Sequence, residues 1–299
     1  MERRKFLELA FKGAVLSALI PLGCSDGTSG GTSGGGPVTS YRVGDTLKSW
    51  DSSENEYQTK PLEHIIEKIA SDGQTTWQTG GLGQTDGNLN YPEKIIFDDR
   101  GTLYVLDSGN CRIAVFDGTG GFLYNIGSYG ITGGGMNYPR DIVITANNII
   151  YVANSYNHTV NIYTTDGSFA GNFGSLGSGT GKLNAPRALA VDSAENIHVI
   201  DRGSGNIKVF TSQGQHVRNY GGSGTGEGQF MAPTSIIIDS SGYSYIADCV
   251  GGYISIFDPQ GAFYSRFQPT SNGQAYLPVA LEWMPEGTIY TRIVESPAA

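Results

Sequence analysis

Residues 134–139 read Gly-Gly-Met-Asn-Tyr-Pro, and an apolar run that ends at Asn154 follows shortly after them. Versions of this stretch recur along the chain. Its proline belongs to a series spaced 47 residues apart, and Pro278 follows the last of the series after 45 residues. The members of the series are Pro92, Pro139, Pro186 and Pro233. Such regular spacing indicates an internal structural repeat with almost no insertions.

Each repeat contains four short apolar runs, separated by Gly, Asn or Asp residues that favour turns. In the first complete copy these runs are residues 95–97, 103–106, 113–116 and 122–126. A four-stranded sheet of this size leaves both of its faces uncovered, so it has to stack on its neighbours. The repeat therefore predicts an all-β propeller in which each copy forms one four-stranded blade.

The last copy, from Pro278 onward, shows only two apolar runs. Residues 64–80 resemble the second half of a repeat, because Gly73 and Gly80 lie 47 residues before Gly120 and Gly127. We expect these N-terminal strands to complete the C-terminal blade, which closes the ring and removes an open sheet edge. This arrangement predicts a propeller of five blades over residues 61–299, with six blades as the alternative.

The repeat also resembles a known family. Its pattern is Gly-x-[Leu/Met/Phe]-x-x-Pro, then Asp-x-x-Asn-x-Arg-Ile, complete at residues 107–113, then Gly-x-Phe and a closing Gly. This pattern is similar to the NHL repeat, so the chain resembles the NHL-repeat β-propeller family. Within that family it resembles a secreted bacterial lipoprotein. The resemblance implies a propeller that has six blades in most members. It implies no single activity, because the family includes scaffolds, ligand binders and some enzymes.

The N-terminal residues 1–23 have the layout of a secretory signal peptide. The run Arg3-Arg4-Lys-Phe-Leu resembles a twin-arginine export signal, and the Leu-Gly-Cys sequence that ends at Cys24 resembles a lipobox. That resemblance implies that Cys24 is lipidated. Residues 24–60, which begin with a Gly-, Ser- and Thr-rich stretch, are predicted to be a flexible tether and linker. We expect an exported protein of the bacterial cell envelope, anchored through this lipid.

The charge of the chain narrows the range of partners. The first 23 residues hold four of the 19 Lys and Arg and two of the 28 acidic residues, so the remainder carries a formal charge near −11. Proteins bind phosphate backbones through clustered Lys and Arg, and an acidic surface repels them. We therefore expect a monomer that binds a protein, a glycan or a small molecule and no nucleic acid. It would contact the membrane only through its lipid anchor.

Two sets of polar residues are candidates for a ligand-binding face. The first is a ring of acceptors that follow the prolines by 15 residues: Asp107, Asn154, Asp201 and Asp248. Such residues commonly accept backbone N–H bonds in turns, which is the alternative interpretation. The second set is Arg140 and Arg187, which directly follow their prolines and should lie near the central channel. Guanidinium groups bind carboxylates and phosphates through two hydrogen bonds, although neighbouring carboxylates compete for them.

The repeat spacing also suggests a metal site. His64, Cys111 and His158 lie 47 residues apart and so occupy equivalent places in three consecutive repeats. Two imidazoles and a thiolate are typical ligands of a zinc ion that keeps a fourth position open. The alternative is that these are polar surface residues in turns. Zinc is the one cofactor that the sequence suggests.

No nucleophile elbow, paired catalytic carboxylate motif, phosphate-binding glycine loop or Cys-x-x-Cys pair is apparent in the sequence. We therefore favour a non-enzymatic, envelope-anchored binding module that presents one propeller face to a protein, glycan or small ligand. The alternative is a metal-dependent lyase or lactonase-like hydrolase with its site at the mouth of the central channel.

Overall fold

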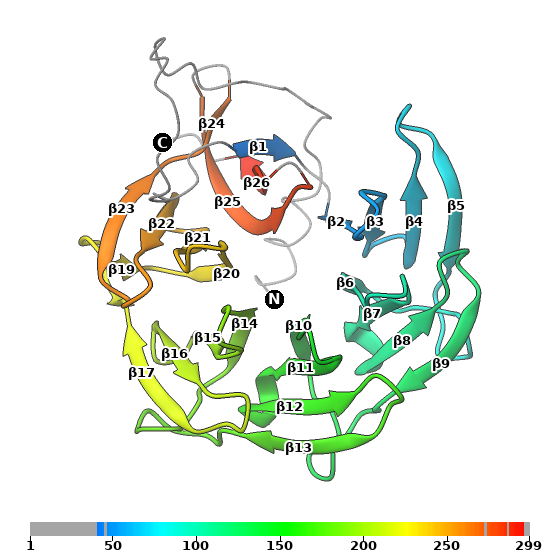
Figure 1. Ribbon diagram of the computed structural model, residues 1–299, viewed down its shortest axis with the longest axis horizontal. Coiled ribbons are helices and arrows are strands. Elements are labelled where there is room, and N and C mark those ends of the chain that lie inside the picture. Colours follow the sequence, from blue (N-terminus) through cyan, green and yellow to red (C-terminus); the bar gives the residue numbers. More distant parts are fainter. Residues whose placement is uncertain (1–40, 45–46, 272–273, 286, 296–299) are drawn as a thin grey trace, which may run out of the picture.

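The computed structural model describes residues 41–44, 47–271, 274–285 and 287–295. Its strands form six four-stranded sheets arranged radially around a central channel (Figure 1). Five of these sheets are antiparallel blades, in which each strand pairs with the next in the chain. In the described residues the helical elements are the 3-10 turns η1 (Ser108–Asn110) and η2 (Ser155–Asn157), and no helix is long and apolar enough to cross a membrane.

The five antiparallel blades have the following strands, each from the channel outward. The first has β2 (Leu47–Trp50), β3 (Glu56–Lys60), β4 (Ile65–Ile69) and β5 (Thr75–Gly80). The second has β6 (Pro92–Phe97), β7 (Leu103–Asp107), β8 (Arg112–Phe116) and β9 (Phe122–Ile126). The third has β10 (Pro139–Ile144), β11 (Ile149–Asn154), β12 (Thr159–Thr164) and β13 (Phe169–Phe173). The fourth has β14 (Pro186–Val191), β15 (Ile197–Asp201), β16 (Asn206–Phe210) and β17 (His216–Tyr220). The fifth has β20 (Pro233–Ile238), β21 (Ser244–Asp248), β22 (Tyr253–Phe257) and β23 (Phe263–Phe267), and the short strands β18 (Gly222–Ser223) and β19 (Gln229–Phe230) precede it.

The sixth sheet is mixed and joins the two ends of the chain. It contains β24 (Thr270–Ser271), β25 (Gln274–Trp283) and β26 (Ile289–Glu295), which pair antiparallel. Strand β1 (Tyr41–Gly44) pairs with β26 in parallel. The ring therefore closes where the N-terminal strand adds to the C-terminal sheet.

The predicted all-β propeller with five antiparallel four-stranded blades is confirmed, but the assignment of its ends was wrong. Strands β4 and β5, in the segment 64–80, pair with β3 and β2 instead of completing the C-terminal sheet. The predicted linker 24–60 was also too long, because β1, β2 and β3 lie within it. An N-terminal strand does close the ring as predicted, but it is β1, and the sheet that it joins is a sixth one.

An Asp–Tyr hydrogen bond found in three blades shows why β2 and β3 form a hairpin. The side chain of Asp51 accepts hydrogen bonds from backbone N–H groups of its turn and from the hydroxyl of Tyr57, at 3.0 Å. Asp98 and Tyr104 make the same contact at 3.2 Å in the next blade. They lie 47 residues after Asp51 and Tyr57. The spacing of Asp51 and Tyr57 could have revealed the first blade from the sequence. It was missed because no proline lies 47 residues before Pro92.

The hydrophobic core lies between neighbouring blades. One cluster joins Tyr57 and Ile66 of the first blade to Ile95 and Val105 of the second. Another joins the fifth blade to the sixth sheet through Tyr245 and Leu281. Because each blade packs both of its faces against neighbours, the burial of apolar side chains depends on the whole ring.

Candidate functional site at the channel mouth

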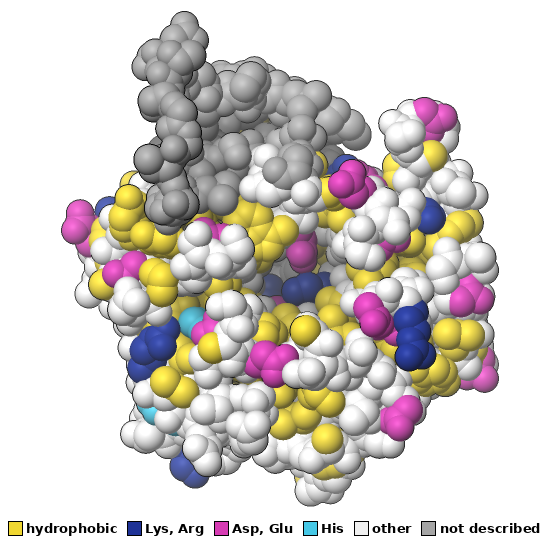
Figure 2. Space-filling view, viewed as in Figure 1, with side chains coloured by type: hydrophobic (Ala, Val, Ile, Leu, Met, Phe, Trp, Pro, Cys, Tyr) yellow, Lys and Arg dark blue, Asp and Glu magenta, His cyan; other side chains and the backbone are white. Residues whose placement is uncertain are grey.

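A repeated β-bulge shapes the mouth of the central channel. In the second blade Pro92 pairs with Asp107 and Lys94 with Leu106, so Glu93 between them has no partner across the strand pair. The residue after the proline is bulged in the same way in the other copies, at Arg140, Arg187, Thr234 and Val279. A bulge redirects the side chain of its extra residue and is common beside functional sites. Figure 2 shows Lys and Arg side chains at the bottom of the central hollow.

Arg140 is held on two sides. Its Nη1 atom lies 3.0 Å from Oε1 of Glu93, and the two side chains are 20% and 15% exposed. Its guanidinium group also lies over the ring of Tyr138, 4.7 Å from the ring centre. The Tyr138 ring in turn stacks on Tyr156. These contacts satisfy and orient Arg140, as the alternative interpretation of the sequence predicted.

Arg187 differs, because it makes no hydrogen bond or ion pair with any described residue. It is partly buried. Burial and the nearby charge of Arg140 lower the pKa of its guanidinium group, while Glu93 and Asp141 favour the charged form. Burial raises the pKa of Glu93, and Arg140 and Arg187 act against that rise. The mouth therefore holds an uncommitted cation close to a carboxylate that binds a proton more readily than usual.

A second charged group lies further along the inner strands. Lys94 Nζ lies 2.8 Å from Asp141 and 3.8 Å from Glu282. Lys94 is in β6 and Glu282 is in β25, and the inner strand β2 lies between these two strands around the ring (Figure 1). The contact between Lys94 and Glu282 therefore joins two sheets that are not neighbours. Burial raises the pKa of Glu282 to about 7; Lys94 opposes this rise and Asp141 adds to it. Asp141 also accepts the N–H groups of Ile142 and Leu189.

The four ring residues are structural, so their predicted place in the ligand-binding face was wrong. They are nearly inaccessible, with exposures of 0% for Asp107, 1% for Asn154, 0% for Asp201 and 3% for Asp248. Each accepts a backbone N–H bond from the residue 17 positions earlier, at 2.6 to 2.7 Å. The sequence predicted bonds to backbone N–H groups of each residue's own turn, and Asp248 accepts such bonds from Val250 and Gly251. The bond that all four share comes instead from the loop before the blade. The buried charges of Asp107 and Asp201 are paired with Arg112 and Lys208.

The predicted metal site is also wrong. His64 Nδ1 accepts the N–H of Tyr91 at 3.0 Å, and His158 Nδ1 accepts the N–H of Ala185 at 3.0 Å. Each imidazole thus connects its own blade to the start of the next. Among the described residues, no three His, Cys, Asp or Glu side chains are close enough to hold a common ion. The donor set present therefore does not fit the zinc ion that the sequence suggested.

The structure brings together Arg140 and Arg187 as predicted and adds residues that sequence analysis missed as site residues. These are Glu93, Lys94, Asp141 and Glu282. The first three occupy the two positions after the repeat proline, which was the available signal. The predicted lipidation site, Cys24, lies outside the described residues, and Cys111 and Cys249 are free thiols.

Comparison with known proteins supports the fold. The NHL repeat model matches residues 89–116 and 136–166, which supports an NHL-repeat β-propeller. No curated protein matches the sequence.

Several solved propeller structures are similar. A streptogramin B lyase has a TM-score of 0.61 and 14% identity, covering 85% of this chain and 83% of the lyase chain. A gluconolactonase from Xanthomonas campestris has a TM-score of 0.61 and 15% identity, covering 84% and 85%. An inactive variant of virginiamycin B lyase from Staphylococcus aureus, solved with quinupristin, has a TM-score of 0.60 and 14% identity, covering 79% and 74%. Identities this low show the shared fold alone.

Proposed function

We propose that this NHL-repeat propeller is an enzyme, a lyase or a lactonase-like hydrolase, whose active site is the channel mouth. The observation that carries the proposal is that the unpaired guanidinium of Arg187 lies near the carboxylate of Glu93, whose pKa is raised by burial. Strongly perturbed groups in a hollow are candidates for catalysis. The three similar enzyme structures support an enzyme over a binding module, and at their low identity this support is by analogy of fold.

In this proposal Glu93 is the general base and Arg187 stabilises the developing negative charge. In a lyase reaction, Glu93 takes the proton next to a carbonyl group, and the negative charge moves to the carbonyl oxygen beside Arg187. The charge then returns to form a C=C bond while the C–O bond to the leaving group breaks with its electron pair, and Glu93 gives its proton to the leaving oxygen. In lactone hydrolysis, Glu93 takes a proton from water, the water oxygen attacks the carbonyl carbon, and the ring C–O bond breaks. The proton then passes from Glu93 to the leaving alkoxide. Arg140 positions Glu93 through their ion pair.

The zinc ion suggested by the sequence takes no part in this mechanism. His64, Cys111 and His158 do not converge, and both imidazole Nδ1 atoms already accept backbone N–H bonds. The proposed chemistry rests on the chain's own carboxylate and guanidinium groups.

The test compares turnover of glucono-δ-lactone and of quinupristin by the purified protein with that by Arg187→Ala and Glu93→Gln. Loss of one charge-stabilising donor typically lowers kcat by a factor of about 100 to 1,000. Arg100→Ala is the control, because it removes an exposed guanidinium from a hairpin turn. We expect turnover that both channel variants lose and the control keeps. Turnover by the wild type that is no higher than by the two channel variants would overturn the proposal.

A non-enzymatic binding module is the second candidate. The exposed, stacked rings of Tyr138 and Tyr156 beside the channel mouth favour it, because rigid exposed aromatic rings are common in recognition surfaces. Saturable binding of either compound without turnover, lost in Arg187→Ala, would support this function instead.

We also propose that the protein is exported, anchored through a lipid on Cys24, and monomeric. The basic N-terminal segment and the lipobox-like sequence support this location. Cys24→Ser should move the protein from the membrane fraction to the soluble fraction of the cell envelope. Unchanged membrane association of this variant would contradict the lipid anchor.

A further inference from the structure

The fourth blade places two arginines close together at the channel mouth. Pro186 pairs with Asp201 across the strands β14 and β15, and Arg187 and Arg202 directly follow these two residues. Both arginines therefore lie at the same end of one hairpin. The charge of Arg202 acts on Arg187, and both charges act on Cys249 of the neighbouring fifth blade.

The repeat itself does not call for an arginine at position 202. The equivalent residue is Ser108 in the second blade and Ser155 in the third, and each is only 5% exposed. Ser155 Oγ donates to the Pro186 carbonyl and so connects the third blade to the fourth. Arg202 replaces this buried hydroxyl with an exposed guanidinium that forms no hydrogen bond or ion pair with any described residue. The position thus provides an accessible charge in place of a packing contact.

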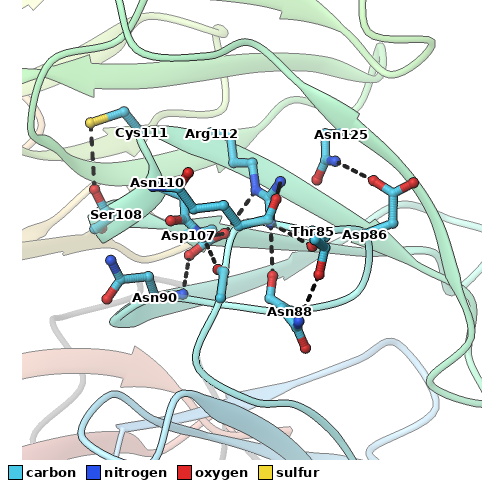
Figure 3. Close-up of polar contacts among 12 residues, drawn as sticks. Thr85, Asp86, Asn88, Asn90, Asp107, Ser108, Asn110, Cys111, Arg112 and Asn125 are labelled. Carbon is cyan, nitrogen blue, oxygen red and sulfur yellow. Dashed lines mark hydrogen bonds and ion pairs between the residues drawn. The ribbon is translucent and has the colours of Figure 1, made fainter.

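The ring carboxylate that stands directly before Arg202 is not available to it. In the second blade the ring residue Asp107 accepts a hydrogen bond from Arg112 Nε at 2.9 Å (Figure 3). In the fourth blade Asp201 is likewise paired, with Lys208 at 2.8 Å. Each of these buried carboxylates already has a cation of its own blade, so Arg202 is left without one.

The carboxylates near Arg187 are also paired. Glu93 and Asp141 favour the charged form of Arg187. Glu93 lies 3.0 Å from Arg140, however, and Asp141 lies 2.8 Å from Lys94. The fourth blade therefore carries two guanidinium groups that form no ion pair with the described residues.

A neighbouring thiol does not supply the missing negative charge. Burial and the charge of Asp248 raise the pKa of the Cys249 thiol, against the effect of the two arginines, so the thiol is neutral at pH 7. Two like charges held close together repel each other, and a bound anion removes this cost. The whole chain has a formal charge of −9, so the excess of positive charge is local to this part of the mouth.

We propose that the substrate of the channel mouth carries a carboxylate group and that Arg202 binds it, while Arg187 contacts the reacting carbonyl oxygen. A planar guanidinium matches a carboxylate through two parallel hydrogen bonds. The single charge of Arg202 suits a carboxylate better than a phosphate, which carries nearly two charges. Arg202 is thus a specificity-determining residue. The inference rests on the proposed function, because it names the substrate class of the same site.

The kinetic test compares two five-membered lactones that differ at one carbon. D-glucaro-1,4-lactone has a free carboxylate where D-glucono-1,4-lactone has a CH2OH group, and we expect a higher kcat/KM for the former. Arg202→Ser copies the second and third blades. It should raise KM for the glucarolactone about 10- to 100-fold with kcat nearly unchanged, because it removes a charged donor that binds substrate and transition state equally. The KM for the gluconolactone should stay the same.

Two further variants serve as controls. Lys182→Ala removes an exposed cation from the loop that leads into the same blade, and it should leave both KM values unchanged. Arg202→Lys keeps the charge without the planar fork, so it should raise KM for the glucarolactone less than Arg202→Ser does. The unfolding midpoint of each variant verifies that it is folded.

Calorimetry with D-glucarate separates this inference from the proposed enzyme activity, because binding is then measured without turnover. We expect the wild type to bind D-glucarate more tightly than neutral D-glucitol, and Arg202→Ser to weaken glucarate binding by about tenfold or more. Such binding without turnover of either lactone would contradict the enzyme and support the carboxylate site. Equal use of the two lactones, or a preference that survives Arg202→Ser in folded protein, would overturn the carboxylate site while the enzyme stands. Absence of both glucarate binding and turnover would overturn both.

Discussion

Asp201 and Lys208 form an ion pair at 2.8 Å in which the side chains are 0% and 1% exposed. Lys208 also donates to the Lys182 carbonyl at 2.7 Å, and Asp201 accepts the N–H of Asn184. The equivalent pair in the third blade is neutral, because Asn154 and Asn161 stand there. In these two blades a lysine accompanies the charged ring residue and an asparagine the neutral one, whereas the Asp248 carboxylate of the fifth blade accepts backbone N–H groups instead.

We predict that Lys208→Asn destabilises the protein by about 3 to 5 kcal/mol, because it leaves the Asp201 carboxylate buried and unpaired. The double variant Asp201→Asn, Lys208→Asn copies the third blade and should recover more than half of this loss. Urea unfolding of the two variants and the wild type measures the difference. A double variant as unstable as Lys208→Asn would contradict the proposed dependence of one charge on the other.

Glu282 should make stability depend on pH near neutrality. Burial raises its pKa from 4.5 to about 7, so between these values the folded protein binds more protons than the unfolded chain. Stability then falls as the pH rises from about 5 to 8, by about 2 kcal/mol for this group. Lys94 and Asp141 face the same carboxyl, and Lys94 limits the effect.

The corresponding variant is Glu282→Gln, which cannot ionise. The free energy of unfolding of wild type minus variant, measured at several pH values from 5 to 8, should decrease over this range. A difference that stays constant or increases with pH would show that the pKa of Glu282 is not raised. Glu227→Gln, at an exposed loop position, is the control for a general loss of negative charge.

The His158 side chain should stabilise the contact between the third and fourth blades without any metal. It has a φ of +57°, where Gly205 and Gly252 stand in the next two copies. We predict that His158→Ala loses about 1 to 3 kcal/mol, because the N–H of Ala185 loses its acceptor while the unfavourable backbone conformation remains. His158→Gly should lose less, since glycine adopts this conformation readily.

Thermal unfolding of these variants and of the wild type, with zinc and with EDTA, provides the measurement. The two solutions should give the same midpoint for each protein. The contrary result would be a wild-type midpoint that rises with zinc while the His158→Ala midpoint does not. That result would support the metal site that the structure contradicts.

Removal of β1 should open the ring. Deletion of residues 1–46 removes this strand and exposes the edge of β26, and an unpaired strand edge promotes association between chains. We expect oligomers or aggregates in size-exclusion chromatography. Deletion of residues 1–36 retains β1 and should leave a monomer. A monomeric 1–46 deletion with an unchanged unfolding midpoint would contradict the role of β1 in closure.

The sequence by itself determined the propeller, since the 47-residue period, the turn residues and the apolar runs are local patterns that each blade repeats. It also predicted that ring residues such as Asp107 accept backbone N–H bonds, but it placed the donors in the residue's own turn, whereas the donor to Asp107 is Asn90 in the preceding loop. The first blade was missed because its copy lacks the proline, although Asp51 and Tyr57 keep the period.

Only the tertiary structure decided which charged residues form a site. The repeat period predicts that Glu93, Arg140 and Arg187 occupy equivalent positions. It does not predict that Arg140 forms an ion pair with Glu93 while Arg187 forms none with the described residues. The contact between Lys94 and Glu282 depends on sheets that are distant in sequence and face each other only after the ring closes. Their distance, and with it the pKa of Glu282, is set by the closure of the ring and the width of the channel, which no local pattern encodes.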